Sequence, residues 1–168
     1  PASVLLVAAM NPCPCGNLGS QKACICPTSA INRYQRKISG PIIDRIDLWL
    51  GVYSIDHKKL EDDQSPRETS TQIRKRVERA RDIQKKRFAD SKLFTNSEMS
   101  VREIKKYCVL DDESKSILQQ AAARLDLSPR SYHRVIKLAR TIADLEDERN
   151  IKSPHILEAL QYRPKSLT

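Results

Sequence analysis

The stretch Ser128-Pro-Arg-Ser-Tyr-His-Arg-Val-Ile-Lys-Leu-Ala-Arg-Thr-Ile-Ala-Asp-Leu145 is the most regular helical pattern in the sequence. Ser128 can cap its first turn, and Pro129 suits the first helical position because an N–H there would have no partner. Apolar residues then recur at helical spacing. They are Val135, Ile136, Leu138, Ala139, Ile142, Ala143 and Leu145. The stretch therefore predicts a long amphipathic helix inside a helical bundle.

Start signals for further helices lie on both sides of this stretch. Each is a Ser, Thr or Asp that can cap a first turn, followed by apolar residues at helical spacing. They fall at Ser70 or Thr71, at Ser100 with Glu103 as a capping box, at Asp111 or Asp112, and at Ser153-Pro154. The first of these helices is expected to run to about Ala89. We therefore expect residues 71–165 to form a helical domain, preceded by a polar linker at residues 57–70.

The first 56 residues carry a different pattern, which is typical of an α/β domain. Residues 3–10, Ser-Val-Leu-Leu-Val-Ala-Ala-Met, are apolar and predict a buried parallel strand that ends at Asn11. Residues 46–53 predict a second strand, and residues 30–38 predict a short helix between the two. Open α/β sheets bind ligands at the carboxyl ends of their strands, so Asn11 is expected beside a ligand.

Composition limits the class of protein. The 168 residues have a formal net charge of +9 and a pI near 9.5, which favours association with polyanions such as nucleic acids. No apolar stretch approaches the roughly 20 residues that cross a bilayer, and no signal segment is present. We expect a soluble cytoplasmic protein. The chain begins at Pro1 and enters a predicted strand almost at once, which favours a piece of a longer protein.

Four of the five cysteines lie within fourteen residues, as two Cys-x-Cys pairs. The pairs are Cys13 with Cys15 and Cys24 with Cys26, and glycines between them allow the loop to fold back. Four thiolates suit a closed tetrahedral zinc site, although Cys-x-Cys departs from the commoner Cys-x₂-Cys spacing. Reduced thiols without metal, or a disulfide, are the alternatives. The fifth, Cys108, is expected to pack in the core.

The helix expected after the linker is strongly basic. Residues 71–92 hold nine Lys or Arg residues and three Asp or Glu residues. A solvated helix face is one interpretation, and contact with nucleic acid phosphates or with another subunit is the other. For nucleic acid, the candidate residues are Arg74, Lys75, Arg79 and Lys86. Few aromatic residues accompany these charges, so base stacking is not indicated.

Three separate pieces of the sequence, in the right order, resemble the magnesium chelatase-like branch of the AAA+ ATPases, of the ComM/YifB type. They are residues 5–16 with Asn11-Pro-Cys-Pro-Cys-Gly16, residues 39–48 with Gly40-Pro-Ile-Ile-Asp-Arg45, and residues 128–145. The resemblance implies an α/β fragment plus an all-α part. These would be the last two strands and a helix of an AAA+ αβα core, with a cysteine-rich insertion at 13–26, followed by a helical lid bundle.

The resemblance also implies a role for three polar residues. Asn11 matches sensor-1, which reads the γ-phosphate and the attacking water. Arg45 matches the arginine finger, which reaches ATP on the neighbouring subunit of a ring, and an ion pair with Asp44 or Asp47 is the alternative. Arg130 matches the sensor-2 arginine of the lid. Two nearby residues compete for that last role. They are His133 and Arg134.

The activity that the resemblance implies for the parent protein is ATP hydrolysis with Mg²⁺ in a hexameric ring, coupled to DNA branch migration. The sequence contains no Gly-x₄-Gly-Lys-Ser/Thr loop and no apolar strand that ends in Asp-Glu. The chain alone is therefore not expected to hydrolyse ATP. Two alternatives stay open: the motor subunit of a true magnesium chelatase, and a zinc-stabilised nucleic-acid-binding module.

Overall fold

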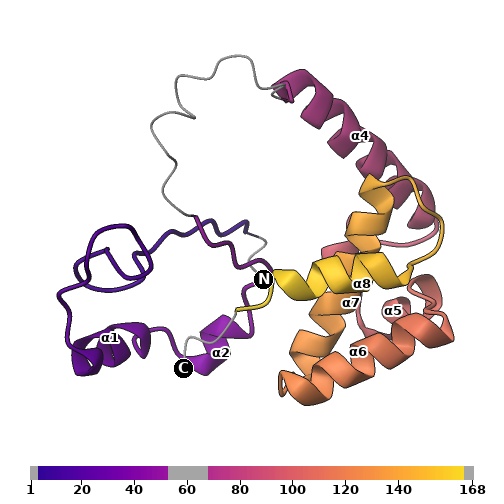
Figure 1. Ribbon diagram of the computed structural model, residues 1–168. Coiled ribbons are helices and arrows are strands. Elements are labelled where there is room, and N and C mark those ends of the chain that lie inside the picture. The colour runs from indigo at the N-terminus through magenta and orange to yellow at the C-terminus, as the bar shows by residue number, and fades with distance from the viewer. Residues whose placement is uncertain (1–3, 53–67, 165–168) are drawn as a thin grey trace.

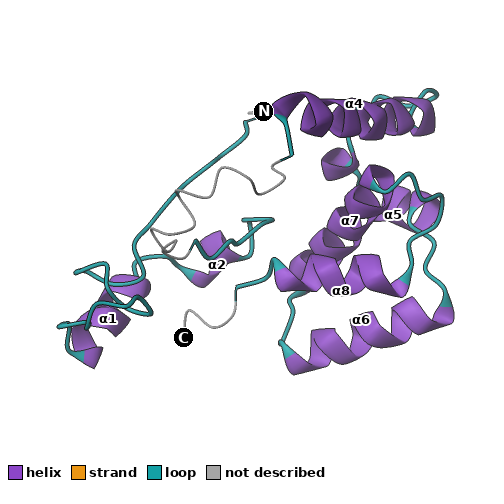
Figure 2. Ribbon diagram, turned by 45° about the horizontal axis from the view of Figure 1, so that its top comes forward, coloured by secondary structure: helices purple, strands orange, loops and turns teal. Residues whose placement is uncertain are grey.

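The computed structural model describes residues 4–52 and 68–164, and the regular secondary structure within them is helical (Figures 1 and 2). In chain order the elements are α1 (Thr28–Gln35), α2 (Gly40–Ile43), α4 (Ser70–Arg87), the 3₁₀ helix η1 (Asn96–Glu98), α5 (Val101–Tyr107), α6 (Asp112–Arg124), α7 (Pro129–Leu145) and α8 (Ser153–Gln161). In Figure 1, helices α4 to α8 form a bundle, and α2 lies between this bundle and α1 at the far left.

Helix α7 lies at the centre of the bundle. It contacts α4, η1, α5 and α8, and α8 also packs on α6. Its apolar face is buried, with Val135 only 1% exposed and Ala139 fully buried, and Leu118 and Ile156 from α6 and α8 complete the same core. Burying a large apolar side chain contributes about 1.5–3 kcal/mol. The helical pattern predicted for this half of the chain is confirmed.

Three of the predicted helix starts are made by the expected side chains. At α6, Asp111 Oδ1 accepts a hydrogen bond from the Ser114 N–H (2.7 Å). Ser128 Oγ accepts a hydrogen bond from the Ser131 N–H (3.2 Å) at the start of α7. The capping box of α5 is also present, because Glu103 Oε2 accepts from the Ser100 N–H (2.8 Å) while Ser100 Oγ accepts from the Arg102 N–H (3.2 Å). A cap of this kind stabilises a helix by about 1 kcal/mol.

Other helix boundaries differ from the prediction by one to three residues. Helix α4 is capped by Thr69, whose Oγ1 accepts from the Gln72 N–H (3.3 Å), so it begins at Ser70. Helix α1 begins at Thr28, directly after Pro27, and covers 28–35 instead of 30–38. One short helix, α2, forms between the predicted helix and the second predicted strand, where no helix was predicted, and Pro41 fits its first turn.

The two predicted strands are absent from the described residues. Residues 4–10 and 46–52 are irregular, and Val4, Leu5, Leu6 and Val7 are 73–91% exposed. A strand is held by hydrogen bonds to neighbouring strands, and no described segment pairs in this way with residues 4–10 or 46–52. The sole β-bridge there joins Leu110 to Ile151 in the bundle. The described residues therefore do not confirm the strands of the predicted α/β part. Ser3 and Tyr53, at the ends of those predictions, lie outside the described residues.

A buried ionic cluster, which no sequence pattern predicted, ties α4 and η1 to α7. Asp144 is fully buried and forms an ion pair with Arg87 of α4. It also accepts from Arg140 Nε (3.1 Å) and from Asn96 Nδ2 (2.8 Å). We call Arg87, Asn96, Arg140 and Asp144 the core ion cluster. It fixes the C-terminal half of α4, while the N-terminal half projects from the bundle (Figure 1).

The described helices include none that is both long and apolar enough to cross a membrane. The predicted linker at 57–70 falls outside the described residues as far as position 67, and its last residue, Ser70, opens α4.

Candidate functional site

The segment that follows α2 is attached to the bundle by a three-residue hydrogen-bond unit. The Ser131 hydroxyl donates to Asp44 Oδ1 (2.8 Å), and Arg163 Nη2 donates to Ser131 Oγ (3.0 Å) while lying 3.8 Å from Asp44 Oδ1. The hydrogen bond from Ser131 lowers the pKa of Asp44, so this carboxylate is ionised at neutral pH. We call these residues the latch. The latch thus connects Asp44, which precedes Arg45, to Ser131, which follows Arg130.

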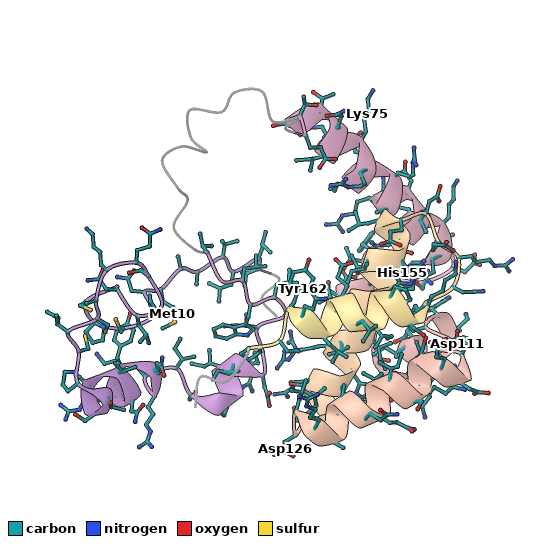
Figure 3. All side chains as sticks on the ribbon, viewed as in Figure 1. Met10, Lys75, Asp111, Asp126, His155 and Tyr162 are labelled. Atoms are coloured by element: carbon teal, nitrogen blue, oxygen red, sulfur yellow. The ribbon has the colours of Figure 1, made fainter. Side chains whose placement is uncertain are left out.

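Further contacts hold the same segment against α7 and the end of α8. Arg163 Nη1 donates to the Ile46 carbonyl (3.3 Å), and the Trp49 N–H donates to the Tyr162 carbonyl (2.9 Å). Asp47 forms an ion pair with Arg134 of α7. Figure 3 marks Tyr162 at this junction, at the end of α8 that faces the N-terminal segment. Residues 44–49 are therefore positioned by α7 and the end of α8.

A cleft of about 800 Å³ lies between α7 and this docked segment. Four of the residues that line it carry or can carry positive charge: Arg130, His133, Arg134 and Lys137. Burial lowers the pKa of Lys137, whose Nζ donates to the Ser97 carbonyl (2.8 Å). One acid, Asp47, also lines the cleft and is paired with Arg134, so the lining keeps a net positive charge and suits an anionic ligand.

Arg130 differs from its competitors for the sensor-2 role. It is exposed in the first turn of α7, lines the cleft, and forms no ion pair with any described residue. Arg134 is already paired with Asp47. His133 is half-buried, with its ring edge-on to Tyr132 at 5.9 Å. Arg130 therefore presents the guanidinium that is most available to a ligand in the cleft.

Arg45 is exposed at the end of α2. Its Nη1 donates to the Pro41 carbonyl (2.7 Å), which holds the side chain against its own short helix. Asp44 belongs to the latch and Asp47 is paired with Arg134, so the structure records no ion pair of Arg45 with either acid. Because the residue is exposed and one recorded hydrogen bond uses only Nη1, the guanidinium has other donors left for an anion.

Asn11 lies in the cysteine loop and not in the α7 cleft. Its side-chain amide is close to Gly16, where an added Cβ would approach Asn11 Nδ2 to 3.7 Å. Met10, the preceding residue, is seen beside the cysteine loop and away from the bundle (Figure 3). Neither Asn11 nor Arg45 lines the cleft that contains Arg130. The structure therefore does not bring the three predicted residues to one site within this chain.

The four clustered cysteines do meet in space. The sulfur atoms of Cys13, Cys15 and Cys24 are 3.5, 3.6 and 3.7 Å apart, and Cys26 places its sulfur within 4.8 Å of each of them. A tetrahedral site with Zn–S bonds of about 2.3 Å requires S···S separations of about 3.8 Å. The donor set and its spacing therefore fit zinc. A disulfide, with its S–S bond of about 2 Å, is not present.

The protonation of these thiols is uneven. Hydrogen bonds from the backbone of Asn17 and Ile25 lower the pKa of Cys15 to about 6, so this sulfur is a thiolate at neutral pH. The backbone of Cys26 lowers the pKa of Cys24, but desolvation and the neighbouring thiols Cys15 and Cys13 outweigh it and raise the value to about 12. A divalent cation among the four sulfurs would favour the thiolate form of all of them.

The loop geometry agrees with the predicted fold-back between the pairs. Gly16 has φ of +80° and Gly19 has φ of +77°, values that L-residues rarely adopt. Cys13 is fully buried inside the loop. The fifth cysteine, Cys108, is 6% exposed within the main core, and burial raises its pKa to about 11, which confirms a packing role.

Metal analysis checks the cysteine site directly. We expect about one zinc ion per chain after purification under reducing conditions, because a closed four-thiolate site holds zinc tightly. The double variant Cys13→Ser/Cys24→Ser should fall below about 0.2 zinc per chain, while Cys108→Ala should keep its metal. Less than about 0.2 zinc in the fresh, reduced, unsubstituted chain would contradict the assignment and favour metal-free thiols.

The candidate nucleic-acid residues of α4 are all exposed, but their charge is partly balanced. Arg79 lies 3.9 Å from Asp147, and a hollow of about 510 Å³ beside Lys75 and Lys86 also contains acidic side chains. Arg74 forms no ion pair with a described residue. The structure therefore presents α4 as a mixed, mainly basic face.

Sequence reasoning missed Ser131 and Arg163, which form the latch with Asp44. No local pattern signals them, because Ser131 is 87 residues from Asp44 along the chain. The one hint was that Asp44 directly precedes Arg45. A carboxylate beside the candidate arginine Arg45 suggested an ion pair within the segment. In the structure, Asp44 instead binds Ser131 of α7.

Comparison with known proteins gives matches along most of the chain. The family model for the magnesium chelatase, subunit ChlI C-terminal, matches residues 67–163, and the model for magnesium chelatase, subunit ChlI, matches residues 1–60. Competence protein ComM of Haemophilus influenzae is 40% identical over 163 residues, which cover 97% of this chain and 31% of that protein. The uncharacterized proteins YifB of Salmonella typhimurium and Escherichia coli are 39% and 38% identical over 164 residues, with the same coverage. The chain thus spans about a third of the length of these relatives.

Proposed function

The chain belongs to the magnesium chelatase-like family of the ComM/YifB type, and on that premise we propose that it is the C-terminal part of an AAA+ ATPase module. The parent protein would be an ATP-driven motor that remodels DNA and works as a ring. This chain would supply the lid, the sensor residues and the arginine finger. It would not hydrolyse ATP alone, because its sequence has neither a phosphate-binding loop nor a Mg²⁺-binding Asp-Glu.

One observation carries the proposal. Arg130 lines a cationic cleft of about 800 Å³ at the start of α7, and it forms no ion pair with a described residue. A planar guanidinium that cannot lose its proton can donate two hydrogen bonds to phosphate oxygens. The helix N-terminus adds partial positive charge to the same place. The cleft therefore suits the phosphates of a nucleotide bound to the same subunit.

Arg45 suits a different nucleotide, bound to the neighbouring subunit. It is exposed, does not line the α7 cleft, and forms no ion pair with a described residue. The latch fixes its backbone to α7, so movement of the lid would also move the finger. We infer that Arg130 acts in its own subunit and Arg45 in the next one around the ring.

The exposed apolar run Val4–Val7 supports a larger assembly of strands in the parent protein. A monomeric protein rarely exposes four successive apolar side chains. In the proposed AAA+ core this run would be covered by neighbouring strands, and Asn11 would then follow a strand end as sensor-1 does. The proposal thus accounts for the strand pattern in the sequence and for its absence from the described chain.

The nucleic-acid part of the proposal involves α4. The N-terminal half of α4 projects from the bundle (Figure 1). Four exposed basic residues are distributed along the whole helix: Arg74, Lys75, Arg79 and Lys86. Such side chains can contact the phosphate backbone.

The second candidate function is a zinc-stabilised nucleic-acid-binding module that is not part of an ATPase. The geometry of the four cysteines favours it. It predicts DNA binding by the parent that ATP does not change, whereas the motor predicts DNA-stimulated ATP turnover.

The Arg130→Ala variant of the parent protein tests the nucleotide role. Loss of a charged hydrogen bond to phosphate costs about 1.5–3 kcal/mol, so we expect the KM for ATP to rise by about 10- to 150-fold. Steady-state ATP hydrolysis measures this. Arg124→Ala, which removes an exposed arginine from α6, is the matched control and should stay within about twofold. Equal kinetics for both variants would refute the proposed role of Arg130.

A further inference from the structure

Helix α1 presents one fully polar face to solvent. Ser29, Asn32, Arg33, Arg36 and Lys37 recur at helical spacing, and all five are exposed. They line a hollow of about 450 Å³. The chain keeps its helical turn beyond Gln35, since the Arg36 N–H donates to the Asn32 carbonyl (3.0 Å). We call these five residues the α1 polar face.

The other face of α1 is apolar and points away from solvent. Ala30, Ile31, Tyr34 and Ile38 are half-buried. Gln35 Nε2 donates to the Pro12 carbonyl (3.3 Å), which ties the helix to the cysteine loop. The α1 polar face is therefore held outward by contacts on the opposite side, and Cys26 lies only two residues before the helix.

The charge around this face is unbalanced in a way that α4 is not. Residues 1–43 contain four Lys or Arg residues, three of them on the α1 polar face, and no Asp or Glu. None of the three forms an ion pair with a described residue, whereas on α4 Arg76, Arg79, Lys85 and Arg87 all do. These cations therefore lack neighbours that would neutralise them.

We propose that the α1 polar face binds the phosphate backbone of nucleic acid. All five side chains can donate hydrogen bonds, and they extend over about 12 Å of helix, a length that spans more than one phosphate of a strand. Arginine, lysine, serine and asparagine are the residue types that contact phosphates and sugars. A contact of this kind positions the nucleic acid without selecting its sequence. The inference rests on the DNA-binding part of the proposed function and adds a second contact, separate from α4.

Salt-dependent binding of this chain to a fluorescent duplex of about 20 base pairs tests the proposal. The variant Arg33→Gln/Arg36→Gln/Lys37→Gln keeps the helix-forming tendency and removes three charges. Between about 50 and 200 mM salt, we expect the slope of log K against log salt to become shallower by about two to three. At the lowest salt, we expect the affinity to fall at least about tenfold. Fluorescence anisotropy measures both quantities, and circular dichroism checks that the helices remain.

A matched control separates site from net charge. The variant Arg102→Gln/Lys105→Gln/Lys106→Gln removes three exposed charges from α5 and should change the slope by less than about one. Equal effects of the two triple variants, or no binding of the duplex at the lowest salt, would overturn the proposal. Tighter binding of poly-glutamate than of the duplex would assign the face to an acidic protein and would also overturn it.

The α4 variant Arg74→Gln/Lys75→Gln/Arg79→Gln distinguishes this inference from the broader one. If it weakens duplex binding while the α1 variant behaves like the α5 control, the α1 proposal fails and DNA binding through α4 stands. If only the α1 variant weakens binding, the α1 proposal stands and the assignment of α4 fails. The kinetics of Arg130→Ala report on the nucleotide site independently of both results.

Discussion

Replacing Arg45 with alanine is expected to lower the rate of ATP hydrolysis by the parent protein by about 10³-fold or more. The side chain is exposed and forms no ion pair with described residues, so its removal leaves no buried charge behind. Its proposed work is to stabilise charge that develops on the phosphate of the neighbouring subunit's ATP. That interaction exists only in the transition state, so kcat should fall while the KM for ATP changes little.

Two further variants sharpen this prediction. Arg45→Lys should restore little activity, because an ammonium cannot make the paired hydrogen bonds of a guanidinium. Lys115→Ala removes an exposed cation from α6, paired only with Asp112 at 3.1 Å, and should leave kcat within about twofold. An Arg45→Ala protein with nearly normal kcat would exclude the finger role.

Mixing the two defective proteins tests whether Arg45 acts between subunits. In rings assembled from equal amounts of Arg45→Ala and Arg130→Ala subunits, about a quarter of the interfaces combine an intact Arg45 with an intact Arg130. At an ATP concentration near the KM of the unsubstituted protein, where Arg130→Ala sites are largely empty, activity should then return to about a quarter of normal. If both arginines served the nucleotide of their own subunit, every site would lack one of them, and mixing would restore nothing.

The helical half of the chain was predictable because its signals are local. A Ser-Pro start and an apolar repeat determine α7, and Ser100 with Glu103 determines the start of α5. Caps and periodicity act within one or two turns, so neighbouring residues suffice to reveal them. The errors at α1 and α4 were of one to three residues, where Pro27 and Thr69 precede the helices in place of the expected caps.

The strands could not be predicted with the same security, because a strand exists only with partners. Residues 3–10 have the composition of a buried strand, and such a composition requires neighbouring segments that cover the apolar side chains. In the described chain those surroundings are absent, so Leu5 is 91% exposed and irregular. The cysteine site is the opposite case. Its partners lie within fourteen residues, and the sequence was enough to group them.

The latch and the core ion cluster depend on contacts between distant parts of the chain. Asp44 meets Ser131 across 87 residues, and Arg87 meets Asp144 across 57. Taken singly, each of these residues resembles an ordinary surface side chain. Only packing reveals that a guanidinium such as Arg140, 2% exposed, is part of the interior.

The core ion cluster gives the second large prediction: Asp144→Ala should destabilise the helical bundle by about 3–5 kcal/mol. The substitution leaves Arg87 and Arg140 as buried like charges and removes the acceptor of Asn96 Nδ2. Burial without a counter-charge is the costly state, because each ion has given up its water. The bundle's total stability is expected to be about 5–15 kcal/mol, so the loss is a large share of it.

Urea unfolding followed by helical circular dichroism measures the loss, with Asp144→Asn as the milder variant if the alanine form does not fold. Asp82→Ala removes an exposed acid whose only recorded ion pair is with Lys85 at 3.6 Å, and it should change stability by less than about 0.5 kcal/mol. Replacing all three charged members, as Arg87→Met/Arg140→Met/Asp144→Leu, should cost less than Asp144→Ala alone, since no ion is left unpaired. If Asp144→Ala were as stable as the Asp82→Ala control, the core ion cluster would contribute little to stability and would not be the contact that holds α4 to α7.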